Sequence, residues 1–126
     1  MADIANLELE EVVRLNPDRL TELYVRLGDH GAEEVICRAM EELAVLLADI
    51  QAVFAEVSPE ILQKAAVGVA ELAEHVGLTS LARVALDVDY CLHMGNVTAI
   101  SATMARMIRI GKKSLTAVWD SRDMSM

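Results

Sequence analysis

The chain has 126 residues, which fits a single domain able to bury a core without disulfides or metals. Hydrophobic residues make up 54% of the sequence and aromatic residues only 3%, a balance that favours packed helices over pleated sheet. The net charge of −9 argues against nucleic-acid binding, and because Glu41, Glu42 and Asp49 interrupt the longest apolar run, no membrane span is predicted.

The N-terminal part predicts two short helical pieces. Residues 7–15 carry leucines and valines between acidic residues, which predicts a helix that stops at Asn16. Asn16 and Pro17 then provide an N-cap and a proline at the first helical position, and the apolar stripe that follows ends at Gly28. We therefore expect residues 1–28 to form a helical extension.

Cap residues and glycines delimit two longer helices in the middle of the chain. Asp29 can cap a helix whose apolar residues repeat in steps of four and three as far as Phe54. Ser58-Pro59 repeats the signal of a cap followed by proline and opens a second helix, which Gly77 ends.

The C-terminal half predicts two further helices. One covers roughly residues 79–94, and Gly95-Asn96 turns the chain into the last helix, whose apolar periodicity ends at Trp119. Because short connections force neighbouring helices to run antiparallel, we expect an all-α, up-down-up-down four-helix bundle. The predicted bundle spans residues 29–119 and is followed by a frayed tail, 120–126, within one domain overall.

The order and punctuation of these helices resemble those of a known signalling family. Gly77-Leu78-x-x-Leu81, Val88-Asp89 and Gly95-Asn96 are similar to the turns of the histidine-containing phosphotransfer (HPt) domain of bacterial two-component phosphorelays, over about residues 30–118. The resemblance implies a four-helix bundle that binds a receiver domain or a histidine kinase.

The residues that carry the family's chemistry are missing from this chain. The HPt motif His-x-Leu-Lys-Gly precedes the glycine matched here by Gly77, and counting back places Val67 at the histidine, Ala70 at the lysine and Glu71 at the motif glycine. Valine has no nucleophilic atom, alanine supplies no cation, and Glu71 adds an anion where the partner's own carboxylates would approach. The position of Val67 therefore cannot accept a phosphoryl group.

Helical spacing places Val67 among polar residues, away from the apolar stripe of its helix. Beside it, Gly68 weakens the helix, and two explanations stay open: a neighbouring helix packed very close, or a partner that approaches a shallow, neutral spot. The docking surface predicted on this helix consists of Gln63, Lys64, Val67, Gly68, Ala70, Glu71 and Glu74.

Three functions remain open on the sequence alone. The preferred one is a non-enzymatic, HPt-like protein that binds a receiver domain or a histidine kinase without accepting phosphate. The second is a helical scaffold or homo-oligomerisation module unrelated to phosphotransfer. The third is an active phosphotransfer protein that uses His75, although a cation favoured by the helix dipole in the last turn explains His75 more simply, and no lysine follows it at helical spacing.

The last predicted helix carries the one basic cluster of the sequence, formed by Arg106, Arg109, Lys112 and Lys113. These cations either complement the helix dipole and keep this face solvated, or form a docking patch for an acidic partner.

No other chemistry is indicated. The histidines, cysteines and carboxylates lack metal-ligand spacing, and no glycine-rich loop or nucleophile motif is present, so we expect no metal, no cofactor and no enzymatic activity. Cys37 and Cys91 lie in apolar helical patterns and Asp3 and Glu8 interrupt the N-terminus, so we expect buried, reduced thiols in a cytoplasmic protein.

Overall fold

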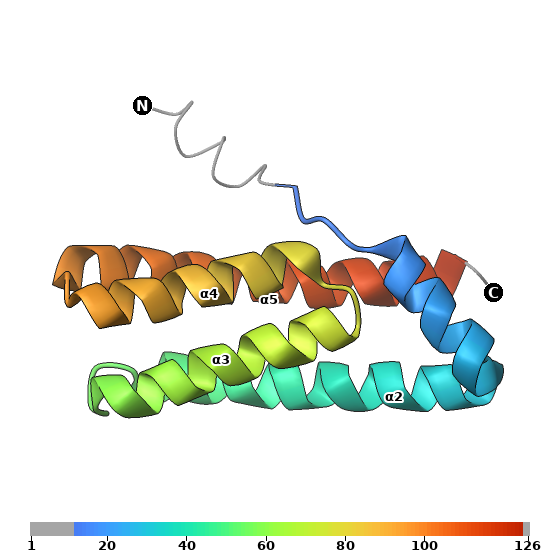
Figure 1. Cartoon of the computed structure of the whole chain (residues 1–126), viewed down its shortest axis with the longest axis horizontal. Coiled ribbons are helices and arrows are strands. Elements are labelled where there is room, and N and C mark those ends of the chain that lie inside the picture. The colour runs from blue at the N-terminus through green and yellow to red at the C-terminus, as the bar shows by residue number, and fades with distance from the viewer. Residues whose placement is uncertain (1–11, 125–126) are drawn as a thin grey trace.

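The computed structural model describes residues 12–124, and the side chains of residues 12–120. This part of the chain forms four helices and no strand: α2 (Pro17–Val53), α3 (Pro59–His75), α4 (Thr79–Met94) and α5 (Val97–Met124). Consecutive helices pack side by side, and α5 returns to contact α2, so each helix has two neighbours (Figure 1). The predicted all-α four-helix bundle is confirmed.

Local capping signals explain where the helices begin and end. The side chain of Asn16 accepts hydrogen bonds from the amides of Asp18 and Arg19 at 3.1 and 3.3 Å, and Ser58 caps α3 in the same way. Gly77 and Gly95 adopt φ angles of +77° and +72°, the left-handed conformation that glycine tolerates best. The predicted bounds of α3 and α4 are therefore confirmed.

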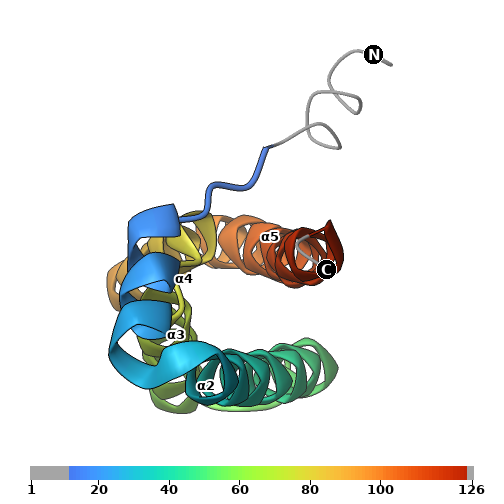
Figure 2. The same ribbon diagram turned by 90° about the vertical axis from the view of Figure 1, so that its right-hand side faces the viewer.

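Residues 17–28 of the predicted N-terminal extension form the first segment of α2, which is kinked. Gly28 leaves the helical conformation (φ 75°, ψ 171°), so the chain turns sharply between the segment before it and the long segment after it (Figure 2). Leu23, on the shorter segment, is fully buried in the common core. The segment 17–27 therefore covers one end of the bundle and belongs to the same hydrophobic unit.

The helix predicted over residues 7–15 lies largely outside the described residues, and its described part, 12–15, is not helical. The backbone there bonds to the connection between α3 and α4 instead: the Arg14 amide donates to the Ser80 hydroxyl at 2.7 Å, and the Asn16 amide donates to the Gly77 carbonyl at 2.7 Å. For residues 12–15 the prediction was wrong, because these tertiary hydrogen bonds compete with helical ones.

The predicted frayed tail is also wrong as far as residue 124, because α5 continues to Met124. Neither proline nor glycine occurs after Gly111, so no residue there interrupts the helical hydrogen bonds. None of the helices in residues 12–124 combines the length and apolar character needed to cross a membrane.

The core runs along the inner faces of all four helices and is almost entirely aliphatic. Ser114 is the one polar side chain buried with it among the described residues. Gly111 on α5 packs tightly against α2, since an added Cβ atom would stand 2.5 Å from Cδ1 of Leu47. Cys37 and Cys91, predicted to be buried, are half-buried thiols.

Candidate functional site

A groove of about 470 Å³ runs between α3 and α4. Its α3 wall contains Val67 together with Glu71 and Glu74, and residues of α4 and of the two connecting segments complete it. The full lining, called here the α3–α4 groove, is Asn16, Val67, Ala70, Glu71, Glu74, Gly77, Thr79, Ala82, Arg83 and Leu86.

Val67 lies at the rim of this groove with 36% of its surface exposed. The position matched to the phosphoaccepting histidine therefore faces outward, as the helical spacing predicts. The small side chains of Ala70 and Ala82 lie next to it and leave the space hollow, while Leu86 supplies an apolar wall from α4. The site offers shape and apolar surface without a nucleophile at Val67.

The charges of the groove are divided between its two helices. Glu71 and Glu74 are exposed on α3, and Arg83 is exposed on α4. An incoming surface that places cations against α3 would match this arrangement, because opposite charges across an interface guide the approach of a partner.

The structure corrects two members of the predicted docking surface. Ala70 is only 5% exposed, because it packs where α3 meets α4, so it shapes the floor of the groove and offers little surface. Gly68 turns toward α2, where an added Cβ would lie 3.5 Å from Cδ2 of Leu46. Lys64 is exposed as predicted, and Gln63 is half-buried with its side-chain amide against Nδ1 of His93 on α4.

Neither sequence-based explanation of Gly68 fits its surroundings. A separation of 3.5 Å is ordinary van der Waals contact, so the neighbouring helix leaves room for a methyl group, and the groove lies on another side of α3. Gly68 therefore lowers the stability of α3, and no neighbouring side chain requires a glycine at this position.

Replacement of Gly68 by alanine should raise the free energy of unfolding by about 0.5–1 kcal/mol, because alanine restricts the unfolded chain and favours the helix. Urea denaturation measures this change. Gly31→Ala is a suitable comparison, since an added Cβ there would stand 3.2 Å from Cβ of Leu27 and the gain should be smaller. If Gly68→Ala instead lowers the free energy of unfolding, α2 packs too closely against Gly68 to admit a methyl group.

His75 lies at the C-terminal end of α3 in contact with Arg19 of α2. The Arg19 guanidinium donates from Nε to the His75 carbonyl at 2.9 Å, and its Nη2 lies 3.2 Å from Nδ1 of the imidazole. Because a guanidinium only donates hydrogen bonds, Nδ1 of His75 is the acceptor in this contact.

The same contact bears on His75 as a phosphoacceptor. Arg19 supplies the cation that the sequence did not show near His75, but its guanidinium engages the lone pair of Nδ1. Arg19 also pairs with Glu22 at 3.2 Å, which places an anion close to the same guanidinium. The lone pair of Nδ1 is thus occupied by this contact and does not face an incoming phosphoryl group.

The side chains of the basic cluster on α5 differ in their exposure, contrary to the prediction of one solvated face. Arg106 and Lys112 are exposed, whereas Arg109 and Lys113 are half-buried, so the four cations do not form one solvated face. Lys113 precedes the last residue of α5 by about three turns, and the helix dipole acts within the last turn. The explanation by the helix dipole is therefore wrong.

The groove residues contributed by other elements were not found from the sequence. Asn16 comes from the N-terminal segment, and Ala82, Arg83 and Leu86 come from α4. The sequence offered one indication of the α4 residues: Leu86 is a large apolar residue on the polar side of an amphipathic helix, where it is 55% exposed. Within residues 12–124, no group of three or more histidine, cysteine or acidic residues could hold a metal ion.

Comparison of the chain with protein-family models, with curated proteins and with solved structures found no match.

Proposed function

We propose that this chain is a non-enzymatic docking protein of the HPt type, which binds a receiver domain or a histidine kinase through the α3–α4 groove without accepting a phosphoryl group. The observation that carries the proposal is the outward position of Val67 in a hollow groove that combines apolar and charged side chains. A valine there allows a partner to dock where phosphoryl transfer would take place and gives the phosphoryl group no acceptor.

The groove suits a helix of the partner. A helix that docks in a groove presents apolar residues at one-turn intervals, and the space beside Ala70 and Ala82 can receive such side chains. Basic residues flanking that apolar ridge would face Glu71 and Glu74. The proposed partner surface is therefore an amphipathic helix with an apolar ridge and a basic edge.

The apolar surface of the groove continues along the exposed side of α4. Leu86 is 55% exposed, and Tyr90 and Met94, one and two turns further, are each 66% exposed. A run of large apolar side chains on one helix is typical of an interaction surface. It also favours a second candidate, self-association of this chain through α4.

The first experiment measures binding to purified receiver and histidine kinase domains by isothermal titration calorimetry. Val67→Lys and Leu86→Lys should each weaken binding about tenfold or more, because each places a charge in the apolar contact. Val45→Lys is the matched control, since Val45 is 61% exposed on α2 outside the groove. Equal affinities for all three variants and the wild type would exclude the groove as the docking site.

The second experiment separates docking from phosphoryl transfer. Incubation with a radiolabelled phosphorylated receiver should give a complex in which this chain carries no label. Acid-labile label on the chain that disappears in His75→Ala would overturn the proposal in favour of an active phosphotransfer protein. Light scattering over a concentration series tests self-association, and a dimer that Leu86→Lys converts to a monomer would support the second candidate.

A further inference from the structure

A second groove, of about 410 Å³, lies between α2 and α3. These two helices pack side by side (Figure 1). The lining of this space, called here the α2–α3 groove, is Glu41, Glu42, Val45, Leu46, Asp49 and Leu72. No residue lines both this groove and the α3–α4 groove, so the two surfaces are independent of each other.

The floor of the α2–α3 groove is apolar. Leu46 and Leu72 are half-buried there, and Val45 is 61% exposed. On the α3 side, the residue next to Leu46 is Gly68, where an added Cβ would stand 3.5 Å from Cδ2 of Leu46. A larger residue at this position would cover part of Leu46, and glycine leaves it uncovered. Large apolar side chains that meet at the surface are typical of an interaction site.

Three carboxylates surround this floor. Glu41, Glu42 and Asp49 are exposed, and no lysine, arginine or histidine lines the groove with them. Within residues 12–120, none of these three carboxylates takes part in an ion pair or a side-chain hydrogen bond. The groove therefore combines an apolar floor with a rim of uncompensated negative charge.

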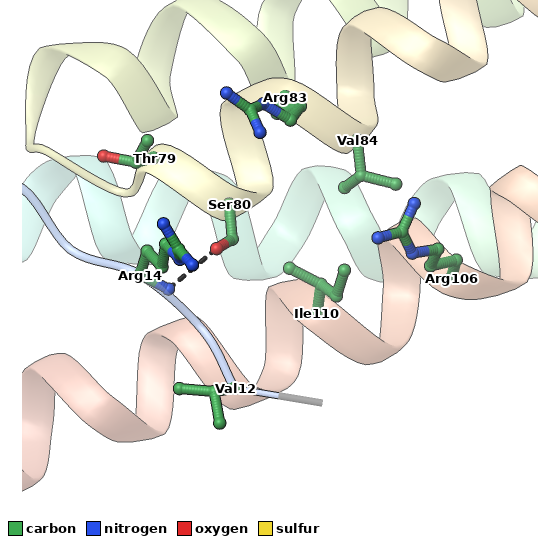
Figure 3. Close-up of a pocket in the computed structure, with 8 residues that line it drawn as sticks. All are labelled: Val12, Arg14, Thr79, Ser80, Arg83, Val84, Arg106 and Ile110. Carbon is green, nitrogen blue, oxygen red and sulfur yellow. Dashed lines mark hydrogen bonds between the residues drawn. The ribbon is translucent and has the colours of Figure 1, made fainter. Parts of the chain in front are cut away.

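Three other cavities in residues 12–120 contain arginine. Arg83 lines the α3–α4 groove, and Arg38 lines a cavity of about 280 Å³ beside the C-terminal end of α3. Figure 3 shows Arg14, Arg83 and Arg106 around the cavity next to the N-terminal segment. A basic partner is attracted to the α2–α3 groove more strongly than to these cavities, because complementary charges guide association and like charges oppose it.

The spacing of the groove residues suits a helix of the partner. Glu42 and Asp49 are about two turns apart, or about 10 Å along α2, and Val45 and Leu46 lie between them. A helix with cations two turns apart and apolar residues in the turn between them would match both carboxylates and the floor. A second copy of this chain fits poorly, since two such grooves would bring their carboxylates face to face.

We infer that the α2–α3 groove binds a basic amphipathic helix of a protein partner. Glu42 and Asp49 pair with the cations of that helix, and Val45, Leu46 and Leu72 receive its apolar side chains. This binding surface is separate from the one proposed for receiver and kinase docking.

The test is an NMR titration of the full ¹⁵N-labelled chain with a synthetic alanine-based helix. This peptide carries two lysines two turns apart and two leucines between them. The amides of Val45, Leu46 and Leu72 should shift in a saturable manner. The double variant Glu42→Lys, Asp49→Lys should weaken binding about tenfold or more, because repulsion replaces attraction at both lysines.

Two comparisons separate this site from a general attraction between an acidic protein and a basic peptide. The double variant Glu33→Lys, Glu56→Lys changes the net charge equally at exposed residues outside the groove, and it should leave the affinity nearly unchanged. A peptide with alanine in place of both leucines should bind about tenfold more weakly, because nothing fills the apolar floor. Circular dichroism verifies that each variant is folded. Equal effects of the two double variants, or equal affinities of the two peptides, would overturn the inference.

Two further variants assign the peptide to one groove. Val45→Lys should weaken binding about tenfold, and Leu86→Lys should leave it unchanged, whether or not a receiver domain docks in the α3–α4 groove. The reverse pattern, or the absence of saturable shifts at Val45 and Leu46, contradicts the assignment. A dimer in light scattering that Val45→Lys dissociates would assign the α2–α3 groove to a second copy of this chain and overturn the inference as well.

Discussion

Gly77→Ala should lower the free energy of unfolding by about 3 kcal/mol. A non-glycine residue in the left-handed conformation costs about 1–2 kcal/mol, and Gly77 has φ +77°. The added Cβ would also stand 2.8 Å from the backbone carbonyl oxygen of Asn16. Backbone cannot move aside as a flexible side chain can, and the adjacent Asn16-to-Gly77 hydrogen bond of 2.7 Å would be strained as well.

Gly95→Ala separates the two causes of this loss. Gly95 has nearly the same conformation, φ +72°, but an added Cβ there meets nothing within 4 Å. Its replacement should therefore cost only the conformational part, about 1 kcal/mol. Urea denaturation of both variants measures the difference, and equal losses would mean that the contact between Gly77 and the N-terminal segment contributes nothing to stability.

The second large effect concerns Leu47, which is 4% exposed and meets Gly111 at the contact of α2 with α5. Leu47→Ala should destabilise the protein by about 2–5 kcal/mol, through the loss of buried apolar atoms and the cavity that remains. Gly111→Ala alone forces Leu47 to move, since the new Cβ would stand 2.5 Å from Cδ1. That crowding offsets the gain of about 1 kcal/mol in helix propensity.

The double variant should be more stable than the sum of the two single changes predicts. Removal of the leucine side chain opens the space that the alanine methyl group needs, so the two substitutions compensate each other by about 1 kcal/mol or more. Thermal and urea denaturation of the wild type, the two single variants and the double variant measures this compensation. Additive effects, within about 0.3–0.5 kcal/mol, would show that Leu47 and Gly111 are not in contact.

The limits of sequence reasoning are clearest on α3. Its ends, its polar face and the outward position of Val67 follow from residues within one helix and were predicted. The resemblance to the HPt motif and the position next to Val67 placed Ala70 and Gly68 on the predicted docking surface. Gly68 instead turns to Leu46 on α2, and Ala70 is buried near Ala82 and Leu86 of α4. A helical wheel defines angles around one axis and does not say which neighbour occupies each angle.

The sequence by itself determined where α3 and α4 begin and end, because capping side chains, prolines and left-handed glycines act within a few residues of one another. Only the tertiary structure decided what surrounds the functional positions. The contacts of Arg19 with His75, of Arg14 with Ser80 and of Gly111 with Leu47 join residues more than fifty positions apart. Such pairs depend on how the helices pack, and the pattern of a single segment carries no information about its packing partner.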